Sequence, residues 1–154
     1  MSAGSSSGRV PVLVNLLWMV PGGVGGSEDS STDALRGVAA AAPDDLQLRL
    51  AVLEPFAAAH PDLAAAFPLH VLAADGANKA RRVLAEQTWL ARTARRVDAR
   101  VVHHAGGTVP FVHPGRVVLT IQDLQPLDLP RNFSMLKRGY LTTMLGRSAR
   151  AADV

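Results

Sequence analysis

Short apolar runs alternate with Ala-rich amphipathic stretches along most of this chain. Such alternation is typical of α/β proteins, in which crossover helices connect parallel strands. We therefore predict a mainly parallel sheet with helices on both faces. Strands are expected at residues 10–19, 47–53, 67–73, 100–103 and 116–121, and helices at 27–41, 55–66, 78–97 and 134–152.

The first strand and the first helix have the clearest local patterns. Residues 10–19 are almost continuously apolar, which is typical of a central strand buried on both faces. The helix expected at 27–41 has Ser27 as its predicted N-cap. Glu28 and Asp29 would lie in its first turn, where carboxylates interact favourably with the helix dipole.

The stretch 78–97 is predicted to be an amphipathic helix with a basic outer face. Its apolar positions recur at helical spacing and comprise Val83, Leu90, Ala94 and Val97. The basic residues between them are Arg81, Arg82, Arg92, Arg95 and Arg96. Such a face is either simply solvated or in contact with anionic lipid headgroups.

Length and composition indicate one domain. Residues 1–8 are rich in Ser and Gly and are expected to be a disordered tail, while 9–154 would form a single α/β domain. The formal net charge of +3 is too small to predict nucleic-acid binding. The chain has no Cys, which excludes disulfides and thiolate metal sites. No apolar run reaches the ~18 residues of a membrane-spanning helix.

Ligands of open parallel sheets bind beyond the carboxyl ends of the strands, so the loops that follow strands are the candidate sites. The first such loop, 21–26, is rich in glycine and includes Gly23, Val24, Gly25 and Gly26. Its backbone N–H groups could approach a phosphate or a sugar, with the positive end of the next helix behind them. The alternative is a tight turn that binds nothing.

The second candidate loop follows His103 and His104 and contains Gly107 and Thr108. Adjacent strand residues point to opposite faces, so only one of the two histidines can face a crevice. That imidazole could orient a substrate, or it could be a structural histidine. We find no further ligands at useful spacing and therefore expect no metal.

The third candidate loop begins with Gln122 and Asp123 at the end of an apolar strand. A carboxylate at this place can be held rigidly beside a substrate. Asp123 is thus a candidate catalytic residue, and its alternative role is to cap the neighbouring turn.

A dinucleotide-binding oxidoreductase is a poorer interpretation of the glycine loop. Its fingerprint requires a third Gly or Ala where this chain has Glu28, and an acidic residue ~20 positions later. Glu54 lies further downstream than that.

Taken together, the three loops resemble the acceptor-side domain of glycosyltransferase family 4 enzymes, which have two facing Rossmann-like domains. The matching stretches are residues 17–28 (LWMVPGGVGGSE), 101–110 (VVHHAGGTVP) and 120–127 (TIQDLQPL). The ending 147–154 is similar to the helix that leads into the next strand of such enzymes. The resemblance implies a Rossmann-like three-layer domain that is the N-terminal half of a two-domain enzyme, truncated before the donor-binding domain.

The function implied by the resemblance is retaining transfer of a sugar from a nucleotide-sugar donor to a hydroxyl acceptor. Gly23, Val24, Gly25 and Gly26 would lie near the donor phosphates and sugar, while His103 or His104 and Asp123 would face the acceptor. Gln122 replaces the histidine that often precedes the aspartate in this family, and it cannot titrate near neutral pH. It could instead supply a hydrogen bond to the transferred sugar.

These implications define the expected partners and the alternatives. The partners would be a nucleotide sugar, a carbohydrate or lipid-linked acceptor, and the missing C-terminal domain, without metal or other cofactor and without nucleic acid. The full-length enzyme would act in polysaccharide or glycolipid synthesis in the cytoplasm, with possible peripheral contact with the inner face of the membrane. This fragment alone is expected to be inactive. The alternative is a noncatalytic carbohydrate-binding or protein-interaction domain.

Overall fold

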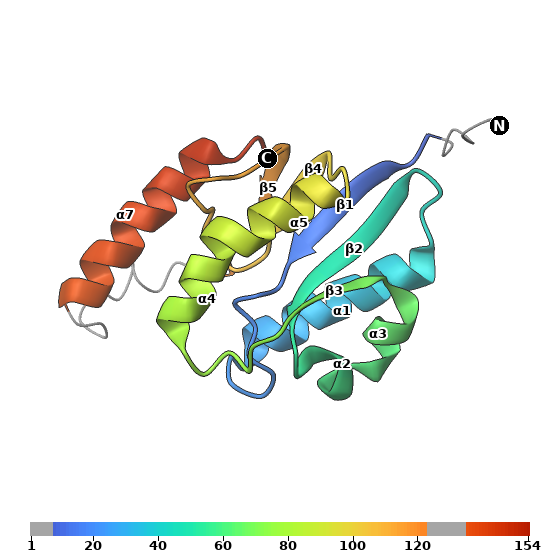
Figure 1. Cartoon of the computed structure of the whole chain (residues 1–154), viewed down its shortest axis with the longest axis horizontal. Helices are drawn as coiled ribbons and strands as arrows, with labels where there is room; N and C mark the ends of the chain where they lie inside the picture. The colour runs from blue at the N-terminus through green and yellow to red at the C-terminus, as the bar shows by residue number, and fades with distance from the viewer. Residues whose placement is uncertain (1–7, 123–134) are drawn as a thin grey trace.

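A computed structural model of the chain describes residues 8–122 and 135–154, and the side chains of the last helix from Thr143 onward. Five strands form one sheet in the order β3-β2-β1-β4-β5, and every described pair is parallel (Figure 1). The strands are β1 (Val10–Asn15), β2 (Leu46–Leu53), β3 (Leu69–Leu72), β4 (Val101–His104) and β5 (Arg116–Leu119). Apart from Gly8, the predicted tail lies outside the described residues.

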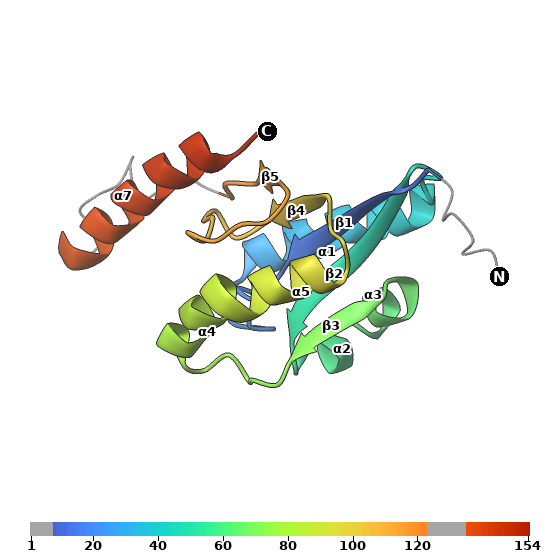
Figure 2. The same cartoon turned by 45° about the horizontal axis from the view of Figure 1, so that its top comes forward.

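Helices cover both faces of the sheet, so the predicted Rossmann-like three-layer α/β fold is confirmed (Figures 1 and 2). One layer contains α1 (Gly26–Ala41), α2 (Phe56–Ala59) and α3 (Pro61–Ala66). The opposite layer contains α4 (Lys79–Ala85), a π-helical turn η1 (Glu86–Leu90) and α5 (Ala91–Arg96). The last helix, α7 (Met135–Ala151), follows β5 in the chain and contacts it.

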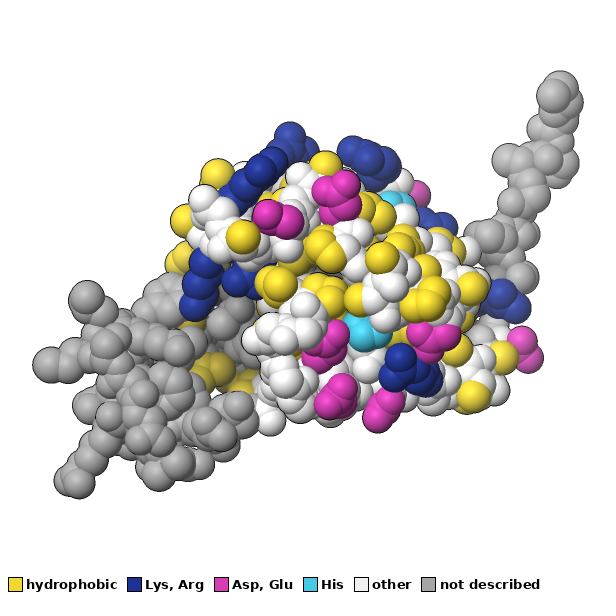
Figure 3. All heavy atoms as spheres, turned by 90° about the horizontal axis from the view of Figure 1, so that it is seen from below, with side chains coloured by type: hydrophobic (Ala, Val, Ile, Leu, Met, Phe, Trp, Pro, Cys, Tyr) yellow, Lys and Arg dark blue, Asp and Glu magenta, His cyan; other side chains and the backbone are white. Residues whose placement is uncertain are grey.

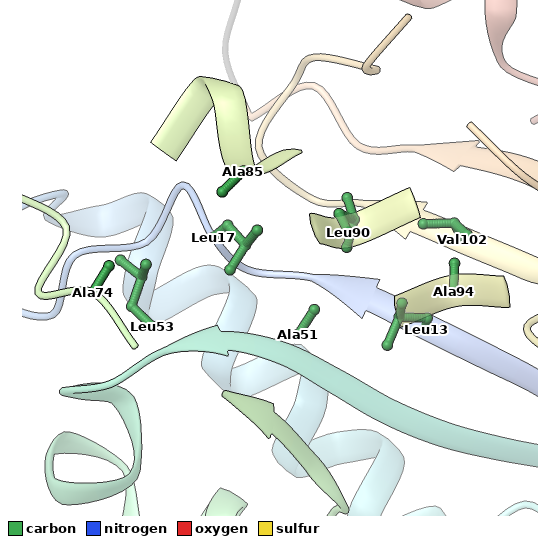
Figure 4. Close-up of a cluster of buried hydrophobic side chains, with 9 residues drawn as sticks. All are labelled: Leu13, Leu17, Ala51, Leu53, Ala74, Ala85, Leu90, Ala94 and Val102. Carbon is green, nitrogen blue, oxygen red and sulfur yellow. The ribbon is translucent and has the colours of Figure 1, made fainter. Parts of the chain in front are cut away.

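The central strands are apolar on both faces because both are covered. Leu13 and Ala51 pack against Leu90 of η1 and Ala94 of α5, in the cluster drawn in Figure 4. The intervening residues of the same strands point the other way and pack under α1, α2 and α3; this second cluster includes Val14, Leu50, Val52, Leu35, Phe56 and Leu63. Each fully buried Leu or Phe contributes about 1.5–3 kcal/mol to stability.

The first strand is shorter than the predicted 10–19. It ends at Asn15, whose side-chain Oδ1 accepts a hydrogen bond from the backbone N–H of Leu17 (3.1 Å). A side chain that bonds the backbone two residues ahead competes with the strand ladder, so the chain turns away here. The residues that follow Asn15 remain largely buried, but they belong to the loop after β1 and not to the strand.

The single helix predicted at 55–66 is also wrong in detail, because it is two short helices. The break lies at His60, which has φ −130° and ψ 67° between α2 and α3. The next residue is Pro61, which disfavours helical geometry in the residue before it and is well suited to the first turn of a new helix.

The stretch predicted as one helix at 78–97 is helical throughout, but its middle turn is π-helical. Asn78 caps its start by accepting the backbone N–H of Arg81 through Oδ1 (3.0 Å). Leu90 and Ala94 are buried as predicted, whereas Val83 is 38% exposed. The predicted outer face holds for the exposed arginines of α4 and α5, which are Arg81, Arg92, Arg95 and Arg96. In Figure 3, Lys and Arg side chains gather along the upper edge of the view.

The last helix is fastened to the loop between β4 and β5. Arg147 Nη1 donates to the carbonyl of Val109 (2.7 Å), and the backbone N–H of Val109 donates to Ser148 Oγ (2.8 Å). Beyond the helix, Asp153 and Val154 run along the free edge of β5. The carbonyl of Val154 accepts the N–H of Leu119 at 2.9 Å.

Candidate functional site

The candidate site lies at the carboxyl ends of β1 and β4, which are neighbours in the sheet. In register, Asn15 at the end of β1 faces His104 at the end of β4. The crossover after β1 lies in one helix layer and the crossover before β4 lies in the other, so the sheet has its topological switch point between these two strands. Ligands of open α/β sheets bind in the crevice at such a point.

A cavity of about 280 Å³ opens at this switch point. It is enclosed by α4, the first turn of η1, and the loops after β1 and β4. Its described lining consists of Trp18, Val24, Lys79, Arg82, Val83, Glu86, Gly106 and Thr108. Two of the sequence-predicted site residues, Val24 and Thr108, therefore meet in one cavity although they are far apart in the chain.

The remaining wall residues were missed by the sequence analysis. Arg82 was predicted on the solvated outer face of its helix, and this is wrong. Its Nη1 donates to the backbone carbonyl of Trp18 (2.8 Å), so the guanidinium is held against the cavity wall. The side chain of Trp18 in turn lies against Gly106: a Cβ added there would be only 2.5 Å from the indole Cγ. The helical spacing of residues in the sequence does not predict this cavity wall, because the wall is formed by contacts between residues far apart in the chain.

The glycine loop begins α1 in a different way from the one predicted. The N-cap is Gly25, with φ 58°, and not Ser27. A glycine is required there because L side chains rarely adopt positive φ. Gly23, Gly25 and Gly26 are exposed and do not line the cavity, so Val24 alone carries this loop into it.

A buried carboxylate of the chain already uses one N–H of this loop. Glu28 Oε2 accepts the backbone N–H of Gly22 (2.8 Å), and Glu28 Oε1 lies 2.9 Å from His60 Nε2. Both side chains are nearly buried, with 11% and 12% exposed. The pair ties the glycine loop to the break between α2 and α3.

Replacing Glu28 with Gln should loosen this tie. The neutral amide is a weaker acceptor for Gly22 and a weaker partner for His60, so we expect a loss of about 1 kcal/mol in unfolding free energy. Amide hydrogen exchange at Gly22, measured by NMR, should also become faster. The matched control is Asp29→Asn, on the exposed neighbour. Equal exchange rates in both variants would contradict the described contact.

The two histidines point to opposite faces, as expected for adjacent strand residues. His103 Nε2 lies 2.8 Å from Thr120 Oγ1 on the α1 face. His104 is 1% exposed on the α4 face, where its Nδ1 lies 3.3 Å from the amide nitrogen of Asn15. Burial lowers the pKa of His104 to about 4, so its imidazole is neutral at physiological pH. It does not line the cavity, so its role is to support Asn15 rather than to touch a ligand.

A second, more apolar cavity of about 160 Å³ lies on the α1 face. His103, Thr120, Ser31 and Gln122 supply its polar lining together with Ser30. The Gln122 amide donates to Ser31 Oγ (3.0 Å) and to the carbonyl of Ala105 (3.2 Å). His103 and Gln122 are therefore brought together, but in a different cavity from Val24 and Thr108.

The first cavity contains one described carboxyl group, that of Glu86. Its Oε1 is 3.4 Å from the Asn15 amide nitrogen, which also bonds His104. Burial raises the pKa of Glu86 to about 7, although the nearby charge of Arg82 opposes that rise. Glu86 begins the π-helical turn, and such turns are frequent at functional sites.

Asp123, the predicted catalytic carboxylate, lies outside the described residues. One described residue of the predicted site lies elsewhere. Gly107, with φ 81°, is buried beside Leu145 of α7 and does not line either cavity.

Within residues 8–122 and 135–154, no group of three or more His, Cys, Asp or Glu side chains is arranged to hold a metal ion. The helices of the same ranges include none that is both long and apolar enough to cross a membrane. Comparisons with protein-family models, curated proteins and solved structures find no match to this chain.

Proposed function

We propose that this chain is the acceptor-side domain of a retaining glycosyltransferase that uses a nucleotide-sugar donor. The observation that carries the proposal is the cavity at the β1/β4 switch point, where the glycine loop and the 105–108 loop meet. Cavities at this place in open α/β sheets hold small ligands. A wall made of an indole, a hydroxyl and charged groups suits a polar molecule with an apolar face, such as a sugar.

The division of labour follows from the resemblance in the loops. The exposed glycines at 23, 25 and 26 would face the donor, which a second domain would hold, and the cavity would hold the acceptor. Transfer to a polysaccharide or glycolipid acceptor in the cytoplasm, with contact at the membrane surface, is the setting that we propose. Asp123 keeps its proposed place beside the acceptor, whereas the Gln122 amide nitrogen already donates to Ser31 and Ala105 at the second cavity and is not assigned to the transferred sugar.

The test is a nucleotide-release and sugar-transfer assay on the natural full-length protein with a panel of nucleotide sugars. Gly26→Trp is the informative variant, because a Cβ at Gly26 meets open space and its φ is not in the left-handed region. The bulky side chain would then fill the donor side without straining the backbone. We expect turnover to fall about tenfold or more, since small displacements of a bound substrate cost that much.

The matched control is Gly37→Trp, on the exposed face of α1, where an added side chain also meets open space. Turnover should stay near wild type in this variant. A folded full-length protein that releases nucleotide from no donor would overturn the transferase proposal.

A noncatalytic carbohydrate-binding domain is the second candidate. It is favoured by one observation, the neutral Gln122 amide, whose nitrogen donates to Ser31 and Ala105 inside the fold. Saturable binding of an oligosaccharide by a protein without turnover would decide for this candidate.

A further inference from the structure

The cavity beside α4 carries two positive charges that form no ion pair within the described part of the chain. Lys79 and Arg82 both line it, and neither forms an ion pair with a described residue. Arg82 is held by the Trp18 carbonyl, and its buried Nε has no hydrogen-bond partner among the described residues. A guanidinium fixed in this way is prepared to bind the oxygens of a phosphate or sulfate group.

Glu86 is the acidic group that shares the cavity, and it would repel such an anion only while it is ionised. The described groups that face it are Arg82 and Lys79 from α4, Asn15 from β1, and His104 behind the same Asn15 amide. Because burial raises the pKa of Glu86 to about 7, its carboxyl is readily protonated near neutral pH. The protonated carboxyl is a hydrogen-bond donor and no longer opposes an anion.

We propose that this cavity binds the phosphate or sulfate ester of its ligand between Lys79 and Arg82, and that Glu86 takes up a proton when the ester binds. If the proposed function holds, the acceptor of the transferase is a phosphorylated or sulfated molecule. A cavity of about 280 Å³ has room for such a group together with part of the sugar that carries it. The binding step itself does not depend on transferase activity.

Isothermal titration calorimetry of the natural full-length protein with inorganic sulfate tests the proposal. Sulfate keeps its charge across the range used, whereas a phosphate ester itself titrates with a second pKa of about 6. If the anion raises the pKa of Glu86 by about one unit, affinity should rise about tenfold between pH 9 and pH 6. The protein should also take up protons in proportion, which titration in buffers of different ionisation enthalpy measures.

Three variants separate the roles of the charges. Glu86→Gln should remove the pH dependence and keep the affinity, because the amide mimics the protonated acid. Lys79→Gln should weaken sulfate binding several-fold at every pH. Arg81→Gln is the matched control, since Arg81 is an exposed cation of the same helix that does not line the cavity. If Glu86→Gln fails to fold, the proton uptake measured for the wild type still tests whether sulfate binding is linked to protonation.

A parallel pair of ligands distinguishes the two sources of the ester. A soluble sugar phosphate is titrated beside phosphatidylcholine vesicles with and without phosphatidylglycerol. Whichever of them shows binding that Lys79→Gln weakens and Arg81→Gln leaves intact identifies the source. An equal loss in both variants would mean general charge attraction and would overturn the proposal.

Failure of this inference differs from failure of the proposed function. A folded protein that binds no sulfate at pH 6 overturns the anion site, and equal binding at pH 6 and pH 9 overturns the proton uptake by Glu86. Either result leaves transfer to a neutral acceptor intact. Proton-linked sulfate binding by a protein without turnover supports the anion site while the transferase proposal fails.

Discussion

Alanine in place of Gly106 should lower the unfolding free energy by roughly 1–3 kcal/mol, the range for overpacking a close-packed site. The added Cβ would lie 2.5 Å from both Cγ and Cδ1 of the Trp18 indole and 3.0 Å from its Cβ. The φ of Gly106 is outside the left-handed region, so alanine strains no backbone torsion there. The whole cost therefore measures the contact between the loops after β1 and β4. Urea denaturation followed by circular dichroism measures it.

Removal of the indole should remove the two contacts at 2.5 Å and leave only the contact at 3.0 Å with the Cβ of residue 18. In a Trp18→Ala background, Gly106→Ala should cost less than about 0.5 kcal/mol, and the difference between the two costs gives the coupling energy. Gly107→Ala is the matched control. Its φ of 81° strains alanine, but its added Cβ meets only Leu145 at 4.0 Å, so its cost should not depend on Trp18. Additive effects of Gly106→Ala and Trp18→Ala would contradict the described wall.

The fold could be predicted because its signals are local. Buried strands with both faces covered produce continuous apolar runs, and the run around Leu13 is of this kind, while the strand around Leu50 was predicted from the alternation of Leu48, Leu50 and Val52. The opposite directions of His103 and His104 follow from strand geometry alone. The break within the helix predicted at 55–66 was harder to predict, because Pro61 acts through the conformation of the residue before it, His60.

The site was predicted less well because its walls depend on contacts between distant residues. Arg82 has the same sequence signal as its exposed neighbours on α4, and only the Trp18 carbonyl distinguishes it. Glu86 gave no signal at all: burial in the fold raises its pKa, and its hydrogen-bond partner Asn15 lies 71 positions away. Ser27 was a reasonable N-cap by residue type, but the positive φ of Gly25 moves the helix start upstream.

In the network of Asn15, Glu86 and His104, the two titratable groups Glu86 and His104 should change the stability in opposite directions as the pH changes. The pKa of His104 is lowered from 6.5 to about 4 in the folded protein, so the unfolded chain binds more protons in that range. This contribution is present above pH 6.5 and is lost as the pH falls towards 4. At 1.36 kcal/mol per pKa unit, it amounts to about 3 kcal/mol.

Glu86 contributes with the opposite sign. Its pKa is raised from 4.5 to about 7, so the folded protein binds more protons than the unfolded chain in that range. The contribution is fully present below pH 4.5 and is lost as the pH rises through 7. Its size is also about 3 kcal/mol. Between pH 4.5 and 6.5 the two contributions nearly cancel in the wild type.

Single variants should reveal the separate contributions of Glu86 and His104, which nearly cancel in the wild type. Relative to wild type, Glu86→Gln should become less stable as the pH falls from 7.5 to 4.5, because the proton uptake of Glu86 is gone. His104→Asn should become relatively more stable as the pH falls from 6.5 to 4. Urea denaturation at a series of pH values measures both differences. Subtracting the wild-type stability at each pH removes the contributions of the titratable groups that the variants share with the wild type.

The double variant provides the internal control for this pair. With both titrating groups removed, its stability should run parallel to that of the wild type between pH 4.5 and 6.5. Differences of the same sign in the two single variants would mean that Glu86 and His104 do not titrate as their burial requires. Opposite signs would support a protonated Glu86 and a neutral His104 near pH 6, where Lys79 and Arg82 then carry the only charges of the described cavity lining.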